Sequence, residues 1–391
     1  MPSIRLGLEK CIASPPPYLR KARVGLLCNP ASVDADLVHS RKRLKSALGN
    51  RLKALYSPQH GFFAEKQDNM IESNHRKDPL LGLPVFSLYS RTRIPNREML
   101  DPIDVLLVDL QDVGTRVYTF IYTMSYCMEA ARNFDKKVVI LDRPNPIGGV
   151  AVEGNCLEPD MFSFVGRYPI PMRHGLTIGE LARLFNDAYG IGCDLDVLPM
   201  AGWQRQMHFG ATGLPWIAPS PNLPTPTSAL VYPGQVIWEG TNVSEGRGTT
   251  QPFELFGAPF LDPYRVLDAV SREALEGAFL RVVEFEPTSN KWQGEICRGF
   301  QLHVTDHHRF KPYCAGLSLL QAIMHCHGEA FEWKAPPYEY EYDRMPIDLI
   351  IGDPKLRQQL SEMVPMSVLE SNWQDGLSAF DTLRQRYFLY P

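Results

Sequence analysis

From residue 23 to about residue 199, short apolar runs alternate with stretches that have the hydrophobic spacing of helices. The runs VLLV (105–108) and VVIL (138–141) are continuously apolar, which is typical of strands buried on both faces of a sheet. Strands that alternate with helices predict a Rossmann-like parallel sheet with helices on both faces. The predicted strands are RVGLLCN, LKALYSP, PVFSLY, DVLLVDL, KVVILD and DLDVLPM, and the predicted helices cover residues 38–48, 118–134 and 178–189.

Beyond about residue 200 the pattern changes to long loops rich in proline. A few strands are predicted there, such as RVVEFEP and GFQLHVTD, and helices near residues 317–325, 355–363 and 376–387. The length of 391 residues exceeds that of one typical domain. We therefore predict an α/β fold with two domains, a Rossmann-like α/β domain over residues 1–200 and a smaller mixed α+β domain over residues 201–391.

Polar side chains follow three of the predicted strands at the point where each strand ends. In parallel sheets, ligands bind beyond the carboxyl ends of the strands. A single polar residue there more often caps the following turn, but three such ends together favour a binding site. The candidate ligand-binding residues at these ends are Gln59, His60, Gln111, Asp112, Arg116, Asp142, Arg143 and Asn145.

The first predicted strand lacks the sequence of a dinucleotide site. RVGLLCNPASV has proline and asparagine where a GxGxxG motif needs glycines, and no GxxxxGK[ST] phosphate-binding loop occurs in the chain. We therefore expect no nucleotide cofactor, and a nucleotide-dependent oxidoreductase is a poor alternative.

The segment WEGTNVSEGRGTTQPFE (238–254) fits neither the helix nor the strand period, and its glycines break regular structure. It combines the carboxylates of Glu239, Glu245 and Glu254 with Arg247, which suits acid–base chemistry and the binding of an anionic group. The alternative is a solvated loop whose charges bind its own backbone. We expect the segment to meet the strand ends in a cleft between the two domains, where Thr241 and Asn242 would also contact a ligand.

The net charge of −4 excludes the basic surface that nucleic acids or anionic membranes require. The eight cysteines form no CxxC pair, and the cluster of Cys314, His325, Cys326 and His327 has poor spacing for zinc, so no metal is expected. The N-terminal residues lack the apolar core of a secretory signal, and no apolar stretch reaches the ~20 residues of a membrane span. The expected location is the cytoplasm.

Several long blocks of the chain resemble the exo-β-N-acetylmuramidase family, formerly a family of unknown function. The resemblance runs from about residue 22 to the C-terminus and implies a Rossmann-like domain, a smaller second domain and a site between them. It also implies removal of terminal N-acetylmuramic acid from the non-reducing end of peptidoglycan fragments. The blocks are PQHGF (58–62), VDLQDVGTRVYT (108–119), VILDRPNPIGG (139–149), YPIPMRHGLTIGEL (168–181), SPNLPT (220–225) and VIWEGTNVSEGRGTTQPFE (236–254).

The implied reaction generally needs two carboxyl groups, about 5 Å apart for retention and roughly 6.5 to 9.5 Å apart for inversion. Glu239 and Glu245 are the first candidates, and His174 is a candidate for substrate binding or proton transfer. Substrate-assisted attack by the acetamido group is a third route. The candidates for binding the lactyl carboxylate of the sugar are Arg143, Arg173 and Arg247.

The chain departs from the family at Gln59, because many members have glutamate there and that glutamate has been considered catalytic. A glutamine cannot exchange a proton at neutral pH, so the acid role would fall to another residue, such as Glu65, Glu239 or Glu245. The alternative function is a sugar-binding protein of the same fold with altered or lost catalysis. With a cytoplasmic location, the hydrolase would act in recycling of imported cell-wall fragments.

Overall fold

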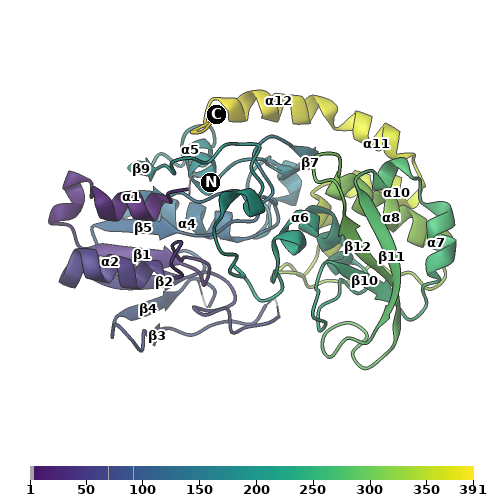
Figure 1. Cartoon of the computed structure of the whole chain (residues 1–391), viewed down its shortest axis with the longest axis horizontal. Helices are drawn as coiled ribbons and strands as arrows, with labels where there is room; N and C mark the ends of the chain where they lie inside the picture. The colour runs from purple at the N-terminus through teal and green to yellow at the C-terminus, as the bar shows by residue number, and fades with distance from the viewer. Residues whose placement is uncertain (1–3, 69, 91) are drawn as a thin grey trace.

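The computed structural model describes residues 4–68, 70–90 and 92–391. A seven-stranded sheet forms the centre of the first half of the chain, and a three-stranded sheet lies in the second half (Figure 1). The large sheet contains, in spatial order, β3 (Arg76–Lys77), β4 (Pro84–Ser87), β2 (Leu52–Ser57), β1 (Val24–Cys28), β5 (Val105–Asp109), β6 (Lys137–Leu141) and β9 (Leu195–Leu198).

All neighbouring strands of the large sheet are parallel except the short edge strand β3, which is antiparallel to β4. Without β3, the spatial order of the six parallel strands is β4-β2-β1-β5-β6-β9. Numbered along the chain, this order is 3-2-1-4-5-6, which is the strand order of the Rossmann fold. The predicted α/β class with a Rossmann-like sheet is therefore confirmed.

Alternate residues of the central strands pack into two separate hydrophobic clusters. In β5, Leu106 and Val108 belong to one cluster, and Val105 and Leu107 belong to the other. This alternation arises because successive side chains of a strand point to opposite faces. Helices α1 (Gly7–Ala13) and α2 (Ser40–Leu48) cover one face, and α4 (Phe120–Asn133) and α5 (Ile178–Asp187) cover the other.

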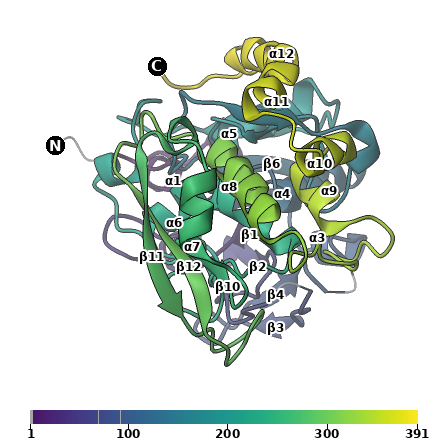
Figure 2. The same cartoon turned by 90° about the vertical axis from the view of Figure 1, so that its right-hand side faces the viewer.

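The second half of the chain packs helices against an antiparallel sheet of β10 (Leu255–Ala258), β12 (Cys297–Val304) and β11 (Ala278–Phe285). Helix α8 (Pro312–His327) contacts both α6 (Pro226–Gln235) and α7 (Pro263–Ala269), as Figure 2 shows. The backbones of α6 and α8 approach so closely at Gly234 that a Cβ atom there would lie 1.9 Å from the carbonyl oxygen of Pro312. A short 3-10 helix, Val236–Gly240, follows α6 directly.

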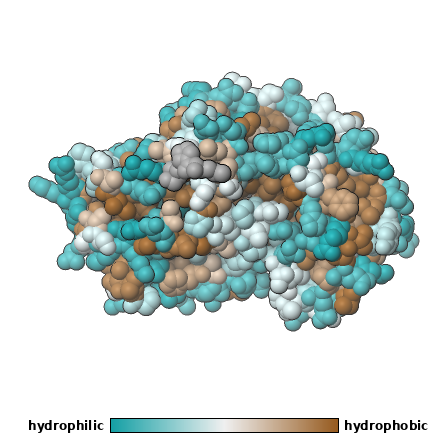
Figure 3. Space-filling view, viewed as in Figure 1, coloured by the Kyte–Doolittle hydropathy of each residue, from teal (hydrophilic) through white to brown (hydrophobic). Residues whose placement is uncertain are grey.

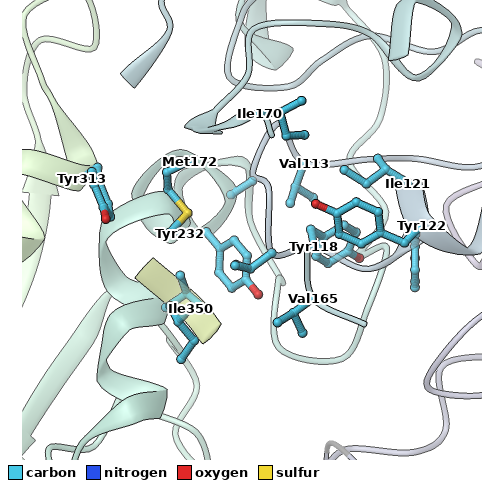
Figure 4. Packing of buried hydrophobic residues seen from close by; sticks show 14 of the residues in the cluster. Val113, Tyr118, Ile121, Tyr122, Val165, Ile170, Met172, Tyr232, Tyr313 and Ile350 are labelled. Carbon is cyan, nitrogen blue, oxygen red and sulfur yellow. The ribbon is translucent and has the colours of Figure 1, made fainter. Parts of the chain in front are cut away.

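Contacts between the two halves of the chain involve the C-terminal helix α12 (Gln374–Gln385) and the short strand β7 (Glu153–Cys156). Helix α12 packs on β7, so the end of the chain returns to the first half. A hydrophobic cluster also spans both halves, and Figure 4 shows Tyr232 and Ile350 beside Tyr118 and Val165. The predicted boundary at residue 200 stays a prediction. The remaining strand and helices are β8 (Pro171–Arg173), α3 (Arg97–Leu100), α9 (Pro346–Ile351), α10 (Pro354–Ser361) and α11 (Met366–Asn372).

The face of the molecule in Figure 3 mixes hydrophilic and hydrophobic residues. Among the residues that the structure describes, no helix has the length and apolar character needed to span a bilayer.

Candidate active site

A pocket with about 460 Å³ of empty space lies between side chains from both halves of the chain. We call it the candidate pocket. It is lined by Gln59, His60, Val117, Tyr118, Thr119, Phe120, Val165, Ser220, Asn222, Leu223, Tyr232, Glu239, Arg247, Phe253, Tyr338 and Glu339.

The turn after β2 contributes Gln59 and His60 to the candidate pocket. His60 has a φ of 74°, a left-handed conformation that is uncommon outside glycine. Burial lowers the pKa of His60 to about 4, so the ring is neutral at neutral pH. Its Nδ1 lies 2.8 Å from the carbonyl oxygen of Lys66, which can only accept, so Nδ1 carries the hydrogen and Nε2 is an acceptor.

The predicted loop over residues 238–254 is largely buried rather than solvated, and it contributes Glu239, Arg247 and Phe253 to the candidate pocket. Arg247 Nη2 donates to Glu239 at 2.6 Å, and the Tyr338 hydroxyl donates to the other Glu239 oxygen at 2.7 Å. Burial lowers the pKa of Arg247, but the carboxylates of Glu239 and Glu245 raise it above its usual range. Arg247 therefore carries a positive charge in the pocket wall.

One nitrogen of Arg247 stays available to a ligand. Its Nη1 is buried and has no hydrogen-bond partner among the residues that the structure describes. A buried donor without a partner is costly, so sites of this kind are normally filled by an acceptor. An anionic or carbonyl oxygen in the candidate pocket would satisfy it.

Glu339 is a second carboxyl group in the candidate pocket, and the sequence analysis did not identify it. It accepts a hydrogen bond of 2.9 Å from Gln59 Nε2 and one of 2.5 Å from the Tyr89 hydroxyl. Burial raises the pKa of Glu339, against these hydrogen bonds, which lower it. The other amide atom of Gln59 accepts from Thr119 at 2.7 Å, so the whole Gln59 side chain is fixed.

Glu245 lies in a neighbouring cavity with about 490 Å³ of empty space, whose wall also includes Glu239 and Arg247. It contacts Lys291 Nζ at 2.7 Å and Arg247 Nε at 3.1 Å. Burial raises the pKa of Glu245, but the positive charges of Lys291 and Arg247 hold it below its usual range. Glu245 is not among the residues that line the candidate pocket, so its predicted catalytic role stays a prediction.

The expectation that all three strand ends share one crevice with this loop is corrected by the structure. At the end of β5, Asp109 forms an ion pair of 2.6 Å with Arg143, and Arg143 also donates to the carbonyl of Val33. Gln111 donates to the carbonyl of Pro144. Phe209 and residues 214–217 close over these side chains and leave a separate small cavity. The cavity near the ends of β1 and β5, where a Rossmann fold binds its ligand, is therefore separate from the candidate pocket.

Asp142 and Asn145 are buried away from the candidate pocket. Asp142 accepts hydrogen bonds from Thr177 Oγ1 and the Gly179 amide at 2.8 Å each, and from the Tyr390 hydroxyl. Asn145 donates to the carbonyl of Leu176 at 3.0 Å. These partners satisfy both side chains inside the protein, so the expected shared position with His60 is wrong.

Four other candidates also lie outside the candidate pocket. His174 and Asp112 are buried together, with His174 Nε2 3.3 Å from Asp112 Oδ2. Arg173 donates to the carbonyl of Ile147 at 2.5 Å. Arg116 is fully buried and donates to backbone carbonyls of both halves, at Asn155, Ile170, Ile350 and Ile351. None of these four side chains lines the candidate pocket, and their predicted binding or catalytic roles stay predictions.

The side chains of Thr241 and Asn242 bond to backbone carbonyls. Thr241 Oγ1 donates to the carbonyl of Trp238, and Asn242 Nδ2 donates to the carbonyl of Ala330 at 2.8 Å. Neither lines the candidate pocket. The structure thus brings together four predicted residues, Gln59, His60, Glu239 and Arg247. In residues 4–68, 70–90 and 92–391, no group of His, Cys, Asp or Glu is placed to hold a metal ion.

The sequence analysis missed the contribution of residues 338–339 and of the aromatic side chains Tyr118, Tyr232 and Phe253. The signal was present in PPYEYEYD (336–343), where tyrosine and glutamate alternate after two prolines. It was overlooked because it follows no strand end and has no regular period.

Comparison with known proteins identifies relatives along the whole chain. The model of the family "Exo-beta-N-acetylmuramidase NamZ, N-terminal" matches residues 24–227, and the corresponding C-terminal model matches residues 230–390. The peptidoglycan beta-N-acetylmuramidase NamZ of Bacillus subtilis (strain 168) is 41% identical over 389 residues, covering 100% of this chain and 92% of that protein.

Two crystal structures of DUF1343 family proteins from Bacteroides fragilis NCTC 9343 have the same fold. One matches with a TM-score of 0.88 at 34% identity, and the other with a TM-score of 0.79 at 28% identity. Each match covers 99% of both chains. The resemblance noted in the sequence is confirmed, and the chain belongs to the exo-β-N-acetylmuramidase NamZ family.

Proposed function

We propose that this protein is a glycoside hydrolase, an exo-β-N-acetylmuramidase that removes terminal N-acetylmuramic acid from peptidoglycan fragments. The observation that carries the proposal is the 41% identity over the full chain to a peptidoglycan β-N-acetylmuramidase. The candidate pocket supports it independently, because two carboxyl groups, Glu239 and Glu339, line one pocket together with Arg247.

Arg247 is the candidate for recognition of the lactyl carboxylate, which distinguishes N-acetylmuramic acid from N-acetylglucosamine. Its charge and the unpartnered Nη1 suit a carboxylate oxygen. Arg143 and Arg173 are less suitable, because both are buried and bonded elsewhere. Tyr232 and Phe253, whose rings meet edge to face at 4.8 Å in the pocket wall, offer an apolar surface to the sugar.

Glu239 is the candidate for the carboxylate that activates water or stabilises the transition state. Both of its oxygens accept hydrogen bonds, from Arg247 and Tyr338. Such a side chain is held in a fixed position, as a catalytic group requires.

The alternative is a sugar-binding protein with altered or lost catalysis, which the amide of Gln59 motivates. Incubation of the purified protein with a chromogenic β-glycoside of N-acetylmuramic acid separates the two functions. The hydrolase releases the chromophore, the N-acetylglucosamine glycoside is a poor substrate, and Glu239→Gln lowers kcat at least ~100-fold. Binding of the sugar without release of the chromophore would instead establish the sugar-binding protein.

For location, we propose the cytoplasm and a role in the recycling of imported cell-wall fragments. All eight cysteines are free thiols, and six of them are buried, which agrees with a reducing compartment. Cell fractionation with an antibody against the native protein tests this proposal. Detection in an exported fraction alone would contradict it.

A further inference from the structure

The turn that carries Glu339 has an unusual sequence for its backbone. Tyr338 and Glu341 exchange two backbone hydrogen bonds of 2.9 Å, and the two residues between them have φ values of 48° at Glu339 and 67° at Tyr340. A two-residue turn with both φ values positive normally contains glycine, asparagine or aspartate. Glutamate and tyrosine here break that preference, which folded proteins tolerate mainly where function requires a particular side chain.

Residues with positive φ values gather in the wall of the candidate pocket. Two other residues of its wall, His60 and Phe253, also have positive φ values. The tight turn allows Tyr338 and Glu339 to enter the same pocket, where Tyr338 bonds to Glu239. The fold thus holds the Glu339 carboxyl group near the Glu239 carboxylate, whose negative charge raises the pKa of Glu339.

The surroundings of Glu339 differ from those of Glu239. Glu239 is paired with the Arg247 guanidinium, whereas Glu339 forms no ion pair with any residue that the structure describes and accepts hydrogen bonds from the neutral groups of Gln59 and Tyr89. The charged groups that face it are Glu239 and Arg93, and Arg93 stacks over Tyr89 and Tyr340. Burial raises the pKa of Glu339. Two carboxyl groups in such different environments suit the separate roles of acid and base.

We propose that Glu339 is the general acid of the glycosidase reaction and delivers its proton to the oxygen of the leaving group. This inference rests on the proposed function and adds a catalytic residue to it. Gln59 is then a positioning residue, because its amide holds one oxygen of Glu339 while Thr119 holds the amide. The acid role is filled without a carboxyl group at position 59.

Each proton in the proposed reaction has a donor and an acceptor. Glu339 gives its proton to the glycosidic oxygen as the bond between that oxygen and C1 breaks, and the bonding pair stays on the leaving oxygen. Water adds its oxygen to C1 and transfers one proton to the second carboxylate, for which Glu239 is the candidate. Solvent returns this proton from Glu239 to Glu339. One water molecule is consumed, and both carboxyl groups regain their starting states.

The test compares two substrates that differ in their need for an acid. In a disaccharide of N-acetylmuramic acid linked β-1,4 to N-acetylglucosamine, the leaving group is a sugar alkoxide, which leaves poorly unless it is protonated. In the 2,4-dinitrophenyl glycoside of N-acetylmuramic acid, the leaving group is dinitrophenolate, which leaves without protonation. For Glu339→Gln we expect kcat/KM on the disaccharide to fall by about 10²- to 10⁴-fold and on the dinitrophenyl glycoside by about tenfold or less. Glu339→Asp, which keeps the proton, is expected to recover part of the disaccharide activity.

The matched control is Glu341→Gln in the same turn, where the partly exposed Glu341 pairs with Arg344 outside the candidate pocket. It is expected to hydrolyse both substrates like the wild type. Equal losses on both substrates for Glu339→Gln, or an aspartate variant no better than the glutamine variant, would overturn the acid role while the proposed function stands. A wild type that hydrolyses neither substrate would overturn the proposed function and this inference together.

Discussion

The side-chain amide of Gln59 donates a hydrogen bond of 2.9 Å to the carboxyl group of Glu339, 280 positions further along the chain. Gln59 follows β2 of the large sheet, and Glu339 lies in the turn between α8 and α9. The bond therefore joins the two halves of the chain at the candidate pocket. It also places an amide where a carboxyl group would share a proton with Glu339.

Replacement Gln59→Glu is expected to shift the pH dependence of catalysis. Two carboxyl groups within hydrogen-bonding distance cannot both ionise easily, so the pKa of the pair rises further. The acid then stays protonated to higher pH, and the alkaline limb of the kcat/KM profile moves up by about one pH unit. The exposed control Gln206→Glu should leave the profile unchanged. An alkaline limb that stays in place or moves to lower pH would argue against Glu339 as the acid.

Arg247→Lys is expected to weaken discrimination between muramic and glucosamine substrates. Lysine keeps the charge that pairs with Glu239 and Glu245 but lacks the fork that can also bind a carboxylate. The ratio of kcat/KM for the two glycosides should fall about 10- to 100-fold, since a charge-assisted hydrogen bond contributes roughly 1.5–3 kcal/mol. The control is Arg344→Lys, at a partly exposed position outside the candidate pocket. An unchanged ratio would show that another residue binds the lactyl group.

Asp142→Asn is expected to change stability rather than catalysis. Burial raises the pKa of Asp142 to about 7, so between about pH 4 and 7 the folded state holds a proton that the unfolded state has lost. The contribution of Asp142 to stability is therefore largest below about pH 4 and is lost as the pH rises to 7.

Urea unfolding at several pH values tests this prediction for Asp142. The free energy of unfolding of the wild type, measured relative to Asp142→Asn, should fall by about 2–4 kcal/mol from pH 4 to pH 7. The exposed variant Asp268→Asn should show no such trend. The kcat/KM of folded Asp142→Asn should stay within about twofold of the wild type, because Asp142 does not line the candidate pocket. A large loss of activity without loss of stability would restore the ligand-binding role predicted from the sequence.

Gly234→Ala is expected to destabilise the fold and disturb the pocket. The new Cβ atom would lie 1.9 Å from the carbonyl oxygen of Pro312, so α6 and α8 must separate. Overpacking of this kind costs about 3 kcal/mol, and α6 leads directly into the 3-10 helix that carries Glu239. Gly376→Ala in α12 is the control, because no atom lies within 4 Å of its new Cβ. Similar melting temperatures for the two variants would refute this account of the contact.

The sequence pattern was sufficient to predict most of the large sheet. The predicted strands at VLLV and VVIL correspond to β5 and β6, and the helix predicted over residues 118–134 is α4. Helix α6 was missed, because residues 219–228 are rich in proline and predict a loop, although Pro226 is tolerated in the first turn of the helix. The short strands β7 and β8 were also missed, since two such strands carry too few residues to show a period.

The candidate site was predicted only in part. Gln59, His60, Glu239 and Arg247 share the pocket as expected, whereas Arg143 and Asp142 bind partners inside the protein. Polar residues at strand ends look alike in sequence whether they face a ligand or another buried side chain. Here Gln111 and Arg143 line a separate small cavity with Phe209 and residues 214–217, whereas Gln59 and His60 line the candidate pocket.

The sequence by itself determined the family, the parallel sheet and the absence of a nucleotide-binding motif, because these depend on local spacing and on long matching blocks. Only the tertiary structure decided which carboxyl groups meet. A turn with two positive φ values places Glu339 where it accepts a hydrogen bond from Gln59. Glu245 forms an ion pair with Lys291 in the neighbouring cavity. Contacts between residues so distant in the chain follow from how the two halves pack, and no local pattern of residues specifies them.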